Sequence, residues 1–547
     1  MVPCAVVSEP RRAREPGSVA ETWNESVIDR AEVVAWPALE DFDDLIIGSG
    51  MAGLAVAALL ARAGRRVAVL EAHDEPGGYA HTFRMKDYRF CAQVHYIFNC
   101  GEGESIHNLL AKLGLADDVP FLRLDPEGFD HIVVAGDRVR IPNGLEKLRL
   151  RLARKFPEAE RALRRYFEII TCLGAELERL DIPAGALSVA TLRSAVRARH
   201  VLYYLRWTLQ DLYDKVGMPP RLRAILAGQS GDYLLPPRDV SLLLHVALVT
   251  LYDRGAYYPK KHYYHFVESL VSAIRGQSGS VVLLEHEVER IEVAGARGEE
   301  RVSGIRTTCG KRLTARRYIS NADPQATARL AGVEHFAKDR RRLDYDYSCG
   351  TFTMYLGVRG LDLREHGFGP FNVWHYPHED LNRLYDNQLR RHDLSDPWLF
   401  LSTPTLHSDA PGLCPPGDQI LEVATACDHG RFAALRRDDR RAYNFEKKRI
   451  RERLLDILEA QYVPKLREHL VMRLTGTPAT NARFCRAPEG NSYGAALTPR
   501  NMGPQRKPFR SSVENLWLVN ATAGFPSVAG AVGAGIRLYE ELSGDVV

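Results

Sequence analysis

Three glycines early in the chain have the spacing of a loop that binds a dinucleotide. The segment 44–71 reads DLIIGSGMAGLAVAALLARAGRRVAVLE, in which Gly48, Gly50 and Gly53 follow one apolar run and Glu71 ends another. Gly48 permits a tight turn, Gly50 lets backbone amides approach a pyrophosphate, and Gly53 lets a helix pack closely on a strand. Glu71 can accept hydrogen bonds from a ribose. The pattern therefore predicts a strand, a glycine turn, a helix and a second strand that together bind a dinucleotide.

The composition limits the class of protein. The chain has 547 residues, 45% of them hydrophobic, and its 73 basic residues nearly balance 69 acidic ones, for a net charge of +4. This balance argues against nucleic acid as a partner. The nine cysteines are odd in number and contain no CxxC pair. Such usage favours reduced thiols in the cytoplasm over a secreted disulfide framework.

Neither a secretory signal nor a transmembrane helix is expected. Residues 1–40 mix arginines, acids and prolines without a continuous apolar run, so we predict a partly disordered tail. The uncharged runs at 45–61 and 515–536 are interrupted by glycines and are more typical of a strand followed by a helix. At 192–212, apolar and aromatic residues alternate with arginines. This face could rest peripherally on a membrane or pack in a protein core.

The hydrophobic periodicity predicts a chain that leaves the nucleotide-binding part and returns to it twice. Residues 144–217 are predicted to be mainly helical, a series of strands begins at residue 280, and 431–461 has the pattern of one charged amphipathic helix. The predicted fold class is α/β, with a Rossmann-like domain (a parallel sheet with a β-meander) plus a discontinuous α+β substrate domain. The Rossmann-like domain would comprise 41–135, 280–345 and 475–547. The substrate domain, a helical part plus an antiparallel sheet, would comprise 136–279 and 346–474.

Further motifs follow the glycine loop along the chain. They are the segment VLEAHDEPGGYAHTF, the YYP of Tyr257–Pro259 before a helix, the strand HEVERI, the turn SNADP and the closing NLWLVNATAGFPSVAGAVGAGI. Together with IIGSGMAGL they resemble the flavin-dependent amine-oxidase-like superfamily, and within it the group of phytoene desaturases, carotenoid isomerases and retinol saturases. The resemblance covers nearly the whole chain from Asp41.

The resemblance implies that the Rossmann-like domain binds FAD in an extended form. Gly77 and Gly78 would pass near the flavin, and the backbone of Val288 would meet the adenine. A helix starting near Val528 would point its N-terminal amides at the isoalloxazine ring, which stabilises negative charge on the reduced flavin. The cofactor-binding residues that we expect are Gly48, Ser49, Gly50, Met51, Ala52, Gly53, Glu71, Ala72, Gly77, Gly78, Val288, Asn321, Asn520, Gly530, Ala531 and Val532.

The chain departs from this family in two places. Relatives in the saturase and isomerase branch tend to have an acidic residue and a glycine before an HY pair, whereas here the segment 90–96 reads FCAQVHY. After YYP the family commonly has a basic residue and two glycines, and this chain has Lys260, Lys261 and His262. These departures indicate a reshaped active site.

Several side chains near the expected site could transfer protons. A flavin exchanges a hydride with a positioned carbon, and forming a carbon–carbon double bond also requires loss of a proton. His95 is one candidate acid or base, although it could instead bond backbone beside the cofactor. No metal site is expected, since His262 and His265 lack a third ligand at a recognisable spacing. The catalytic candidates are His95, Tyr96, Lys260, His262 and Tyr493.

The leading hypothesis is an FAD-dependent oxidoreductase, desaturase-like, acting on carbon–carbon bonds of a long hydrophobic isoprenoid or polyene. Alternatives are a saturase or a redox-neutral cis–trans isomerase on the same substrates, an amine oxidase, and a non-catalytic carrier of prenyl groups. The chain has no second GxGxxG after a strand, which argues against direct use of NAD(P)H. Oxygen, a quinone or a separate reductase would then exchange electrons with the flavin.

Overall fold

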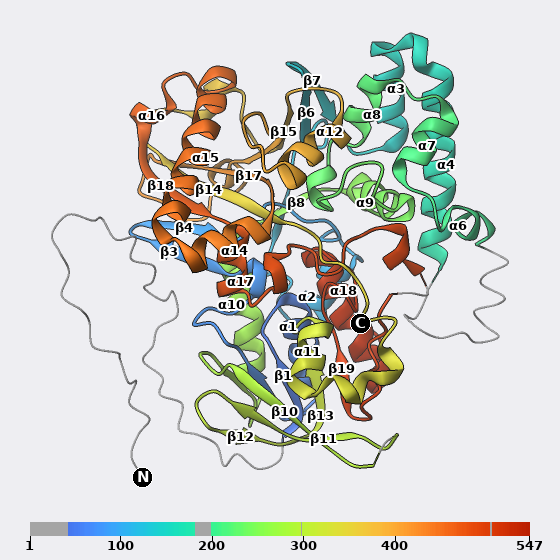
Figure 1. The fold of residues 1–547 in the computed structure, drawn as a ribbon, viewed down its shortest axis with the longest axis vertical. Helices are drawn as coiled ribbons and strands as arrows, with labels where there is room; N and C mark the ends of the chain where they lie inside the picture. Colours follow the sequence, from blue (N-terminus) through green and yellow to red (C-terminus); the bar gives the residue numbers. More distant parts are fainter. Residues whose placement is uncertain (1–41, 181–197, 297, 504–505) are drawn as a thin grey trace.

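The glycine motif follows the central strand of a five-stranded parallel sheet (Figure 1). The computed structural model describes residues 42–180, 198–296, 298–503 and 506–547, so the predicted tail at 1–40 lies outside the described residues. Neighbouring strands come from distant parts of the chain, as predicted for a sheet that the chain re-enters. In spatial order they are β19 (Leu516–Leu518), β13 (Ala315–Ser320), β1 (Phe42–Ile47), β2 (Val67–Leu70) and β9 (Val281–Leu283).

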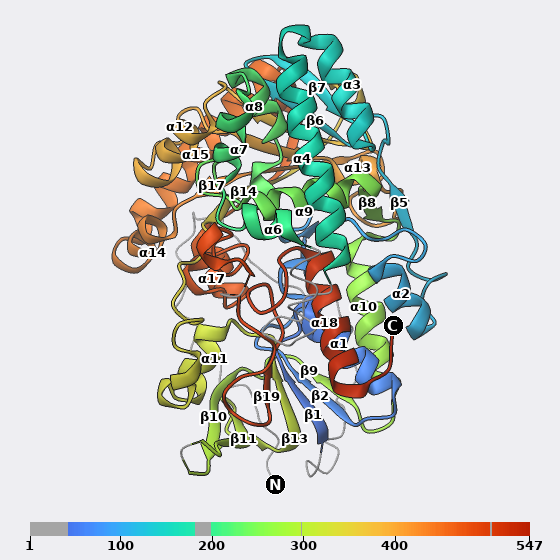
Figure 2. The same ribbon diagram turned by 90° about the vertical axis from the view of Figure 1, so that its right-hand side faces the viewer.

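The two faces of this sheet bury alternate residues of the same strands. Ile46 and Val69 pack in one core cluster and Leu45 and Leu70 in another, because successive side chains of a strand point to opposite faces. On the first face α1 (Met51–Arg62) packs against α10 (His262–Arg275) and α18 (Val528–Ser543), close to α2 (Ser105–Leu113) (Figure 2). Ala52 and Ala55 of α1 meet Gly535 of α18, where a Cβ would lie 2.7 Å from the Ala52 carbonyl oxygen, so small residues permit this close packing.

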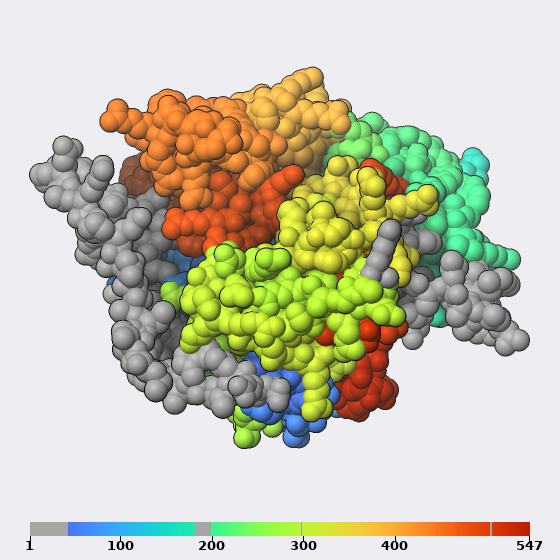
Figure 3. All heavy atoms as spheres, turned by 60° about the horizontal axis from the view of Figure 1, so that its bottom comes forward, coloured from blue at the N-terminus to red at the C-terminus, as the bar shows by residue number. Residues whose placement is uncertain are grey.

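The second face carries an antiparallel meander, which emerges at the surface in the middle of the view in Figure 3. Val288 and Ile291 of its first strand pack in the same core cluster as Leu45 and Leu70. The elements on this side are β10 (Val288–Ala294), β11 (Arg301–Thr307), β12 (Arg312–Leu313) and α11 (Pro324–Ala331). Asp323 caps the N-terminus of α11, since its carboxylate accepts hydrogen bonds from the amides of Gln325 and Ala326.

A seven-stranded mixed sheet forms the other half of the molecule. Its alternate residues again separate two environments: Trp374 and Phe400 belong to the large central core, while Val373 and Leu401 pack in the core that contains α15. All neighbouring pairs are antiparallel except β15 with β6. The strands in spatial order are β18 (Leu470–Gly476), β14 (Gly350–Val358), β17 (Gln419–Cys427), β16 (Leu399–Ser402), β15 (Asn372–Tyr376), β6 (Asp130–Val134) and β7 (Asp137–Ile141).

Helices surround this second half. The predicted helical region at 144–217 contains α3 (Leu145–Lys155), α4 (Glu160–Arg179), α6 (Arg199–Tyr204) and α7 (Leu209–Val216), and its part at 181–197 lies outside the described residues. The other helices are α8 (Pro220–Leu226), α9 (Leu242–Arg254), α12 (Leu381–Tyr385), α13 (Pro404–His407), α14 (His429–Asp438), α15 (Arg440–Gln461), α16 (Leu466–His469) and α17 (Pro478–Phe484). Two small antiparallel ladders join β3 (Thr82–Met85) to β4 (Tyr88–Cys91) and β5 (Phe121–Arg123) to β8 (Tyr257–Pro259). In the described part of the chain, no helix is both long enough and apolar enough to cross a bilayer.

Two boundaries differ from those predicted from the sequence. The division at 135 separates β6 from β7, which form one hairpin within the seven-stranded sheet, so that boundary is wrong by at least the length of β6. The helix predicted at 431–461 is two helices, because the carboxylate of Asp439 accepts hydrogen bonds from the amides of Arg441 and Ala442 and so starts α15. In addition α10, placed by sequence in the substrate domain, packs on α1. The division into two domains otherwise stays a prediction.

Candidate active-site cavity

A cavity of about 640 Å³ is lined by residues of both sheets. This volume lies within the range of ligand sites, roughly 300–1,000 Å³. Gly48 and Glu71 follow strands of the parallel sheet, whereas Trp374 and Phe400 lie on the seven-stranded sheet. We call the first part the glycine end and the second the aromatic end.

Backbone conformation and close packing fix the glycine end. Gly48 has φ of +90°, which favours glycine, and it turns the chain from β1 into α1. A Cβ on Gly53 would lie 2.6 Å from the carbonyl oxygen of Gly48, and one on Gly50 would lie 2.4 Å from Oδ1 of Asn321. Asn321 is itself held, since its Nδ2 donates to the carbonyl of Val519 at 2.6 Å. Only glycine therefore lets this turn pack so closely on Asn321 and on the start of α1, as in loops that bind a pyrophosphate.

The carboxylate of Glu71 faces the same end. Its Oε2 accepts hydrogen bonds from the amide and the hydroxyl of Ser49, at 2.8 and 2.6 Å, and its Oε1 accepts one from the amide of His73 at 2.9 Å. An ionised carboxylate has about four acceptor positions, so Glu71 retains capacity for a ribose hydroxyl. Ser49 is buried and acts on the site by orienting Glu71.

The N-terminus of α18 also opens on the cavity. Ser527 and Val528 line it, and Ser527 has φ of +82°, an uncommon conformation for a residue other than glycine. The hydroxyl of Ser527 accepts a hydrogen bond from the amide of Gly530 at 3.0 Å, and its carbonyl accepts one from the amide of Ala531. Those two amides are thus occupied within the first turn, and the helix dipole still presents its positive end to the cavity.

The structure brings most of the predicted cofactor residues to one surface. Ser49, Gly53, Gly530 and Val532 do not line the cavity and support the residues that do. The open turn, the oriented carboxylate and the helix N-terminus are the features that a dinucleotide carrying a flavin requires, so the residues fit FAD. The predicted residues that line the cavity are Gly48, Gly50, Met51, Ala52, Glu71, Ala72, Gly77, Gly78, Val288, Asn321, Asn520 and Ala531.

The aromatic end is apolar and tightly packed. The ring of Tyr252 stacks on that of Tyr96 with centroids 4.8 Å apart, and the ring of Phe400 lies 4.5 Å from that of Trp374. Such rings offer a long hydrophobic molecule a rigid wall with few polar atoms. The apolar and aromatic residues that line this end are Phe98, Leu234, Leu248, Tyr252, Trp374, Trp398 and Phe400.

One hydroxyl group and two carboxyl groups meet in this apolar wall. They belong to Tyr96, Asp130 and Asp232, which we call the acid trio. The hydroxyl of Tyr96 lies 3.0 Å from Oδ2 of Asp130 and 2.7 Å from Oδ2 of Asp232. Burial raises the pKa of Asp130 to about 7 and raises that of Asp232 well above its ordinary value. A hydroxyl has one proton to donate, so bonding to both carboxyl groups requires that one of them is protonated. Tyr96 and Asp232 line the cavity, so this proton lies at its wall.

His95 forms a second polar pair at the cavity wall. Its Nδ1 lies 2.7 Å from Oε2 of Glu422, which is almost completely buried on β17. Burial raises the pKa of Glu422, and the hydrogen bond from His95 lowers it less than burial raises it. Oε1 of Glu422 has no hydrogen-bond partner among the described residues. The pair therefore offers a second place where a proton can be held beside the cavity.

The remaining catalytic candidates are divided. Tyr493 lines the cavity and donates from its hydroxyl to the carbonyl of Gly231 at 3.1 Å. Lys260 is exposed, because pairing of β8 with β5 carries it to the surface, and His262 is buried at the start of α10 with its pKa lowered to about 3 by burial. Neither lines the cavity, so the structure does not support a catalytic role for Lys260 or His262. His262 has φ of +67°, a conformation typical of the glycines that the family resemblance implies there.

Sequence reasoning missed Asp130, Asp232 and Glu422. A signal existed for Glu422, which is the only charged residue in the nine-residue strand QILEVATAC, and for Asp130, which begins the apolar strand DHIVV. A single carboxyl group in a buried strand usually has a partner. No comparable pattern surrounds Asp232.

Several known proteins resemble this chain in sequence or in fold. The family described as NAD(P)-binding Rossmann-like domain matches residues 46–113. All-trans-retinol 13,14-reductase of Danio rerio is 26% identical over 90% of this chain and 84% of its own length. Prolycopene isomerase 1 of an Oncidium hybrid cultivar is 23% identical over 87% of this chain and 79% of its own, and the lycopene-forming phytoene desaturase of a Paracoccus strain is 26% identical over 90% and 95%. Among solved structures, putrescine oxidase bound to putrescine has a TM-score of 0.61 at 16% identity, covering 92% of this chain and 99% of its own.

Proposed function

Because this chain belongs to the FAD-dependent amine-oxidase-like superfamily and is an FAD-dependent oxidoreductase, we propose that it acts on carbon–carbon bonds of a long hydrophobic isoprenoid or polyene. The observation that carries this proposal is the single cavity in which a glycine end fitted to FAD continues into an apolar, aromatic end. Relatives named for acting on retinol, prolycopene and phytoene support the same class of substrate.

The glycine end would hold the cofactor. The turn at Gly48 and Gly50 would bind the pyrophosphate, Glu71 the adenosine ribose, and the N-terminus of α18 would lie toward the flavin. When bound, FAD accepts a hydride from a carbon or returns one to it. The stacked rings of Tyr96 and Tyr252 would hold the substrate beside the flavin and exclude water.

The acid trio would handle the proton. Asp130 has a pKa of about 7, so the trio can accept a proton or donate one near neutral pH. Tyr96 and Asp232 are the members that line the cavity. Asp130, behind them, would supply the proton to Tyr96 or accept it from Tyr96. In desaturation the trio would take the proton from one of the two carbons that become doubly bonded, while the hydride from the other carbon would go to FAD. The pair of His95 and Glu422 would serve a second position along the substrate.

One observation favours the reverse reaction as a second candidate. The Tyr96 hydroxyl contacts two carboxyl groups, which requires a protonated carboxyl in the acid trio. Adding hydrogen across a double bond consumes such a proton, so saturation fits the resting protonation state of the site. Redox-neutral isomerisation would use the same groups.

An anaerobic spectroscopic assay tests the proposal. The FAD-loaded protein is mixed with polyenes and dihydro-polyenes, and the absorbance of flavin and polyene is followed. We expect bleaching of the flavin by a dihydro-polyene, or loss of polyene absorbance with chemically reduced flavin. Re-oxidation by oxygen, by a quinone or by an added reductase system identifies the electron acceptor. A protein that responds only to amines, with release of hydrogen peroxide, contradicts the proposal.

We also propose peripheral contact with a membrane through α6. Leu202 and Tyr203 are 54% and 60% exposed, and Lys215 lies 5.1 Å from the ring of Tyr203. An exposed apolar and aromatic patch beside basic side chains fits the interface of an anionic bilayer. Part of the face predicted from the sequence lies at 192–197, outside the described residues. Flotation with vesicles that contain anionic lipid, compared between the wild type and Leu202→Ser with Tyr203→Ser, tests this contact, and equal flotation contradicts it.

A further inference from the structure

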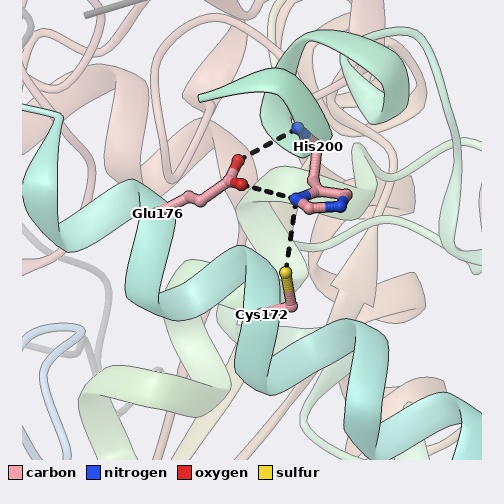
Figure 4. A group of neighbouring side chains, drawn as sticks. All are labelled: Cys172, Glu176 and His200. Carbon is pink, nitrogen blue, oxygen red and sulfur yellow. Dashed lines mark hydrogen bonds and ion pairs between the residues drawn. The ribbon is translucent and has the colours of Figure 1, made fainter. Parts of the chain in front are cut away.

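Three side chains with metal-ligating atoms meet between α4 and α6. Cys172 and Glu176 are four residues apart on α4 and so share one face of the helix, and His200 lies in the first turn of α6 (Figure 4). Nδ1 of His200 is 3.4 Å from Sγ of Cys172 and 2.5 Å from Oε1 of Glu176. The three ligand atoms all lie within 4.8 Å of one another. None of these residues lines the active-site cavity.

Both partners approach the same nitrogen of His200. Nδ1 carries at most one proton, so the sulfur and the carboxylate oxygen compete for it. A nucleophilic triad would instead place the thiol and the carboxylate on opposite ring nitrogens. In Figure 4, Nε2 of His200 points away from both side chains. The geometry is therefore unsuited to an activated cysteine. Instead, three atoms that can donate electron pairs to a metal, Sγ of Cys172, Oε1 of Glu176 and Nδ1 of His200, lie close to one another.

We propose that Cys172, Glu176 and His200 bind one divalent zinc ion. Thiolate, imidazole and carboxylate are the ligand types that zinc takes. Ligand atoms around a tetrahedral zinc ion are roughly 3.3–3.6 Å apart, by the bond lengths of such sites. The separation of Sγ and Nδ1 already has this size, and the contact between Nδ1 and Glu176 widens by less than about 1 Å. His200 is 39% exposed at its side chain, which leaves room for that movement and for a water molecule as fourth ligand.

The surroundings of Glu176 orient it for this role. Its Oε2 accepts hydrogen bonds from the amides of His200 and Val201, at 3.1 and 3.0 Å. These bonds fix the carboxylate and leave Oε1 directed at the cluster, as outer hydrogen bonds do in known metal sites.

The ion would be structural. It would join α4 to α6 across a separation of 24 residues in the sequence between Glu176 and His200. Because none of the three ligands lines the cavity, loss of the ion is expected to leave the flavin in place. Its effect would be to hold α6 against α4.

Cobalt substitution tests the site in the FAD-loaded protein. After treatment with a chelator, Co²⁺ and then Zn²⁺ are added, since visible bands of tetrahedral Co²⁺ lie at longer wavelength than the absorbance of oxidised flavin. We expect about one Co²⁺ per chain with tetrahedral bands, displacement of Co²⁺ by Zn²⁺, and a rise in melting temperature on adding Zn²⁺. Flavin content should not change.

Matched variants separate this site from adventitious binding. Cys172→Ser and His200→Gln should abolish the bands and the shift in melting temperature, whereas Cys309→Ser, at an exposed thiol, and His265→Gln should retain both. Circular dichroism of each metal-free variant verifies that it is folded. If Cys172→Ser does not fold, Glu176→Gln replaces it as the variant that should lose the metal. Absence of tetrahedral bands in the wild type overturns the proposal, as does equal binding by Cys172→Ser and Cys309→Ser.

Discussion

The two ends of the cavity are built by different means. At the glycine end the shape comes from backbone turns and from close approach, as where a Cβ on Gly53 would meet the carbonyl oxygen of Gly48 at 2.6 Å. At the aromatic end it comes from side chains, with Tyr96, Asp130 and Asp232 sharing protons inside an apolar wall. A change at the first end should therefore affect cofactor binding, and a change at the second should affect turnover while the cofactor stays bound.

The largest effect on cofactor binding is expected from Gly53→Ala. The new methyl group would press on the Gly48 carbonyl and distort the turn, so we expect flavin content to fall by at least about tenfold, a cost of about 1.4 kcal/mol or more. The ratio of flavin to protein absorbance after purification measures it. Gly533→Ala is the control, because its Cβ would come no nearer than 3.6 Å, to Nη1 of Arg537. Full flavin content in Gly53→Ala would mean that the glycine end tolerates a side chain at this position, so close packing does not determine its shape.

Asp232→Asn should show the opposite behaviour. The amide cannot exchange a proton with the substrate, so we expect turnover to fall by roughly 10²-fold, the usual contribution of a general acid or base. Flavin content should match the wild type. Asp344→Asn, at an exposed carboxylate paired with Arg500, is the control. Turnover of Asp232→Asn equal to that of the control would remove the acid trio from the mechanism.

The same contrast explains what could be predicted from the sequence. The glycine turn, Glu71 and the N-terminus of α18 are each encoded by residues close together in the chain, with a spacing that the backbone dictates. The acid trio joins Tyr96 to residues 34 and 136 positions away, and His95 to one 327 positions away. Such contacts form only in the folded chain, where the loop after β4 meets β6 and β17 of the seven-stranded sheet. The return of the chain to the first sheet could be predicted from its motifs, whereas the membership of β6 in the seven-stranded sheet could not.

The acid trio should also affect stability as the pH changes. Burial raises the folded-state pKa of Asp130 to about 7, above the value of about 3.9 for an unfolded aspartate. Between these values the folded state binds more protons, so this contribution is complete below about pH 4 and is lost as pH rises through about 7. The free energy of unfolding should fall over this window by up to about 1.4 kcal/mol per pH unit relative to Asp130→Asn. Urea unfolding of both proteins at several pH values measures the difference, and parallel curves would contradict it.

The smallest effect is expected where the aromatic end only shapes the cavity. Phe400→Leu removes a ring that lines the cavity beside His95 and Trp374. Because the ring packs against the substrate equally before and during reaction, its loss should raise KM several-fold, worth about 1 kcal/mol, with kcat changed less than about twofold. Phe368→Leu is the control, since that residue is equally buried but packs in the core around α15, away from the cavity. A fall in kcat with unchanged KM would assign Phe400 to the reacting centre, and a loss of flavin would show that the two ends are not independent.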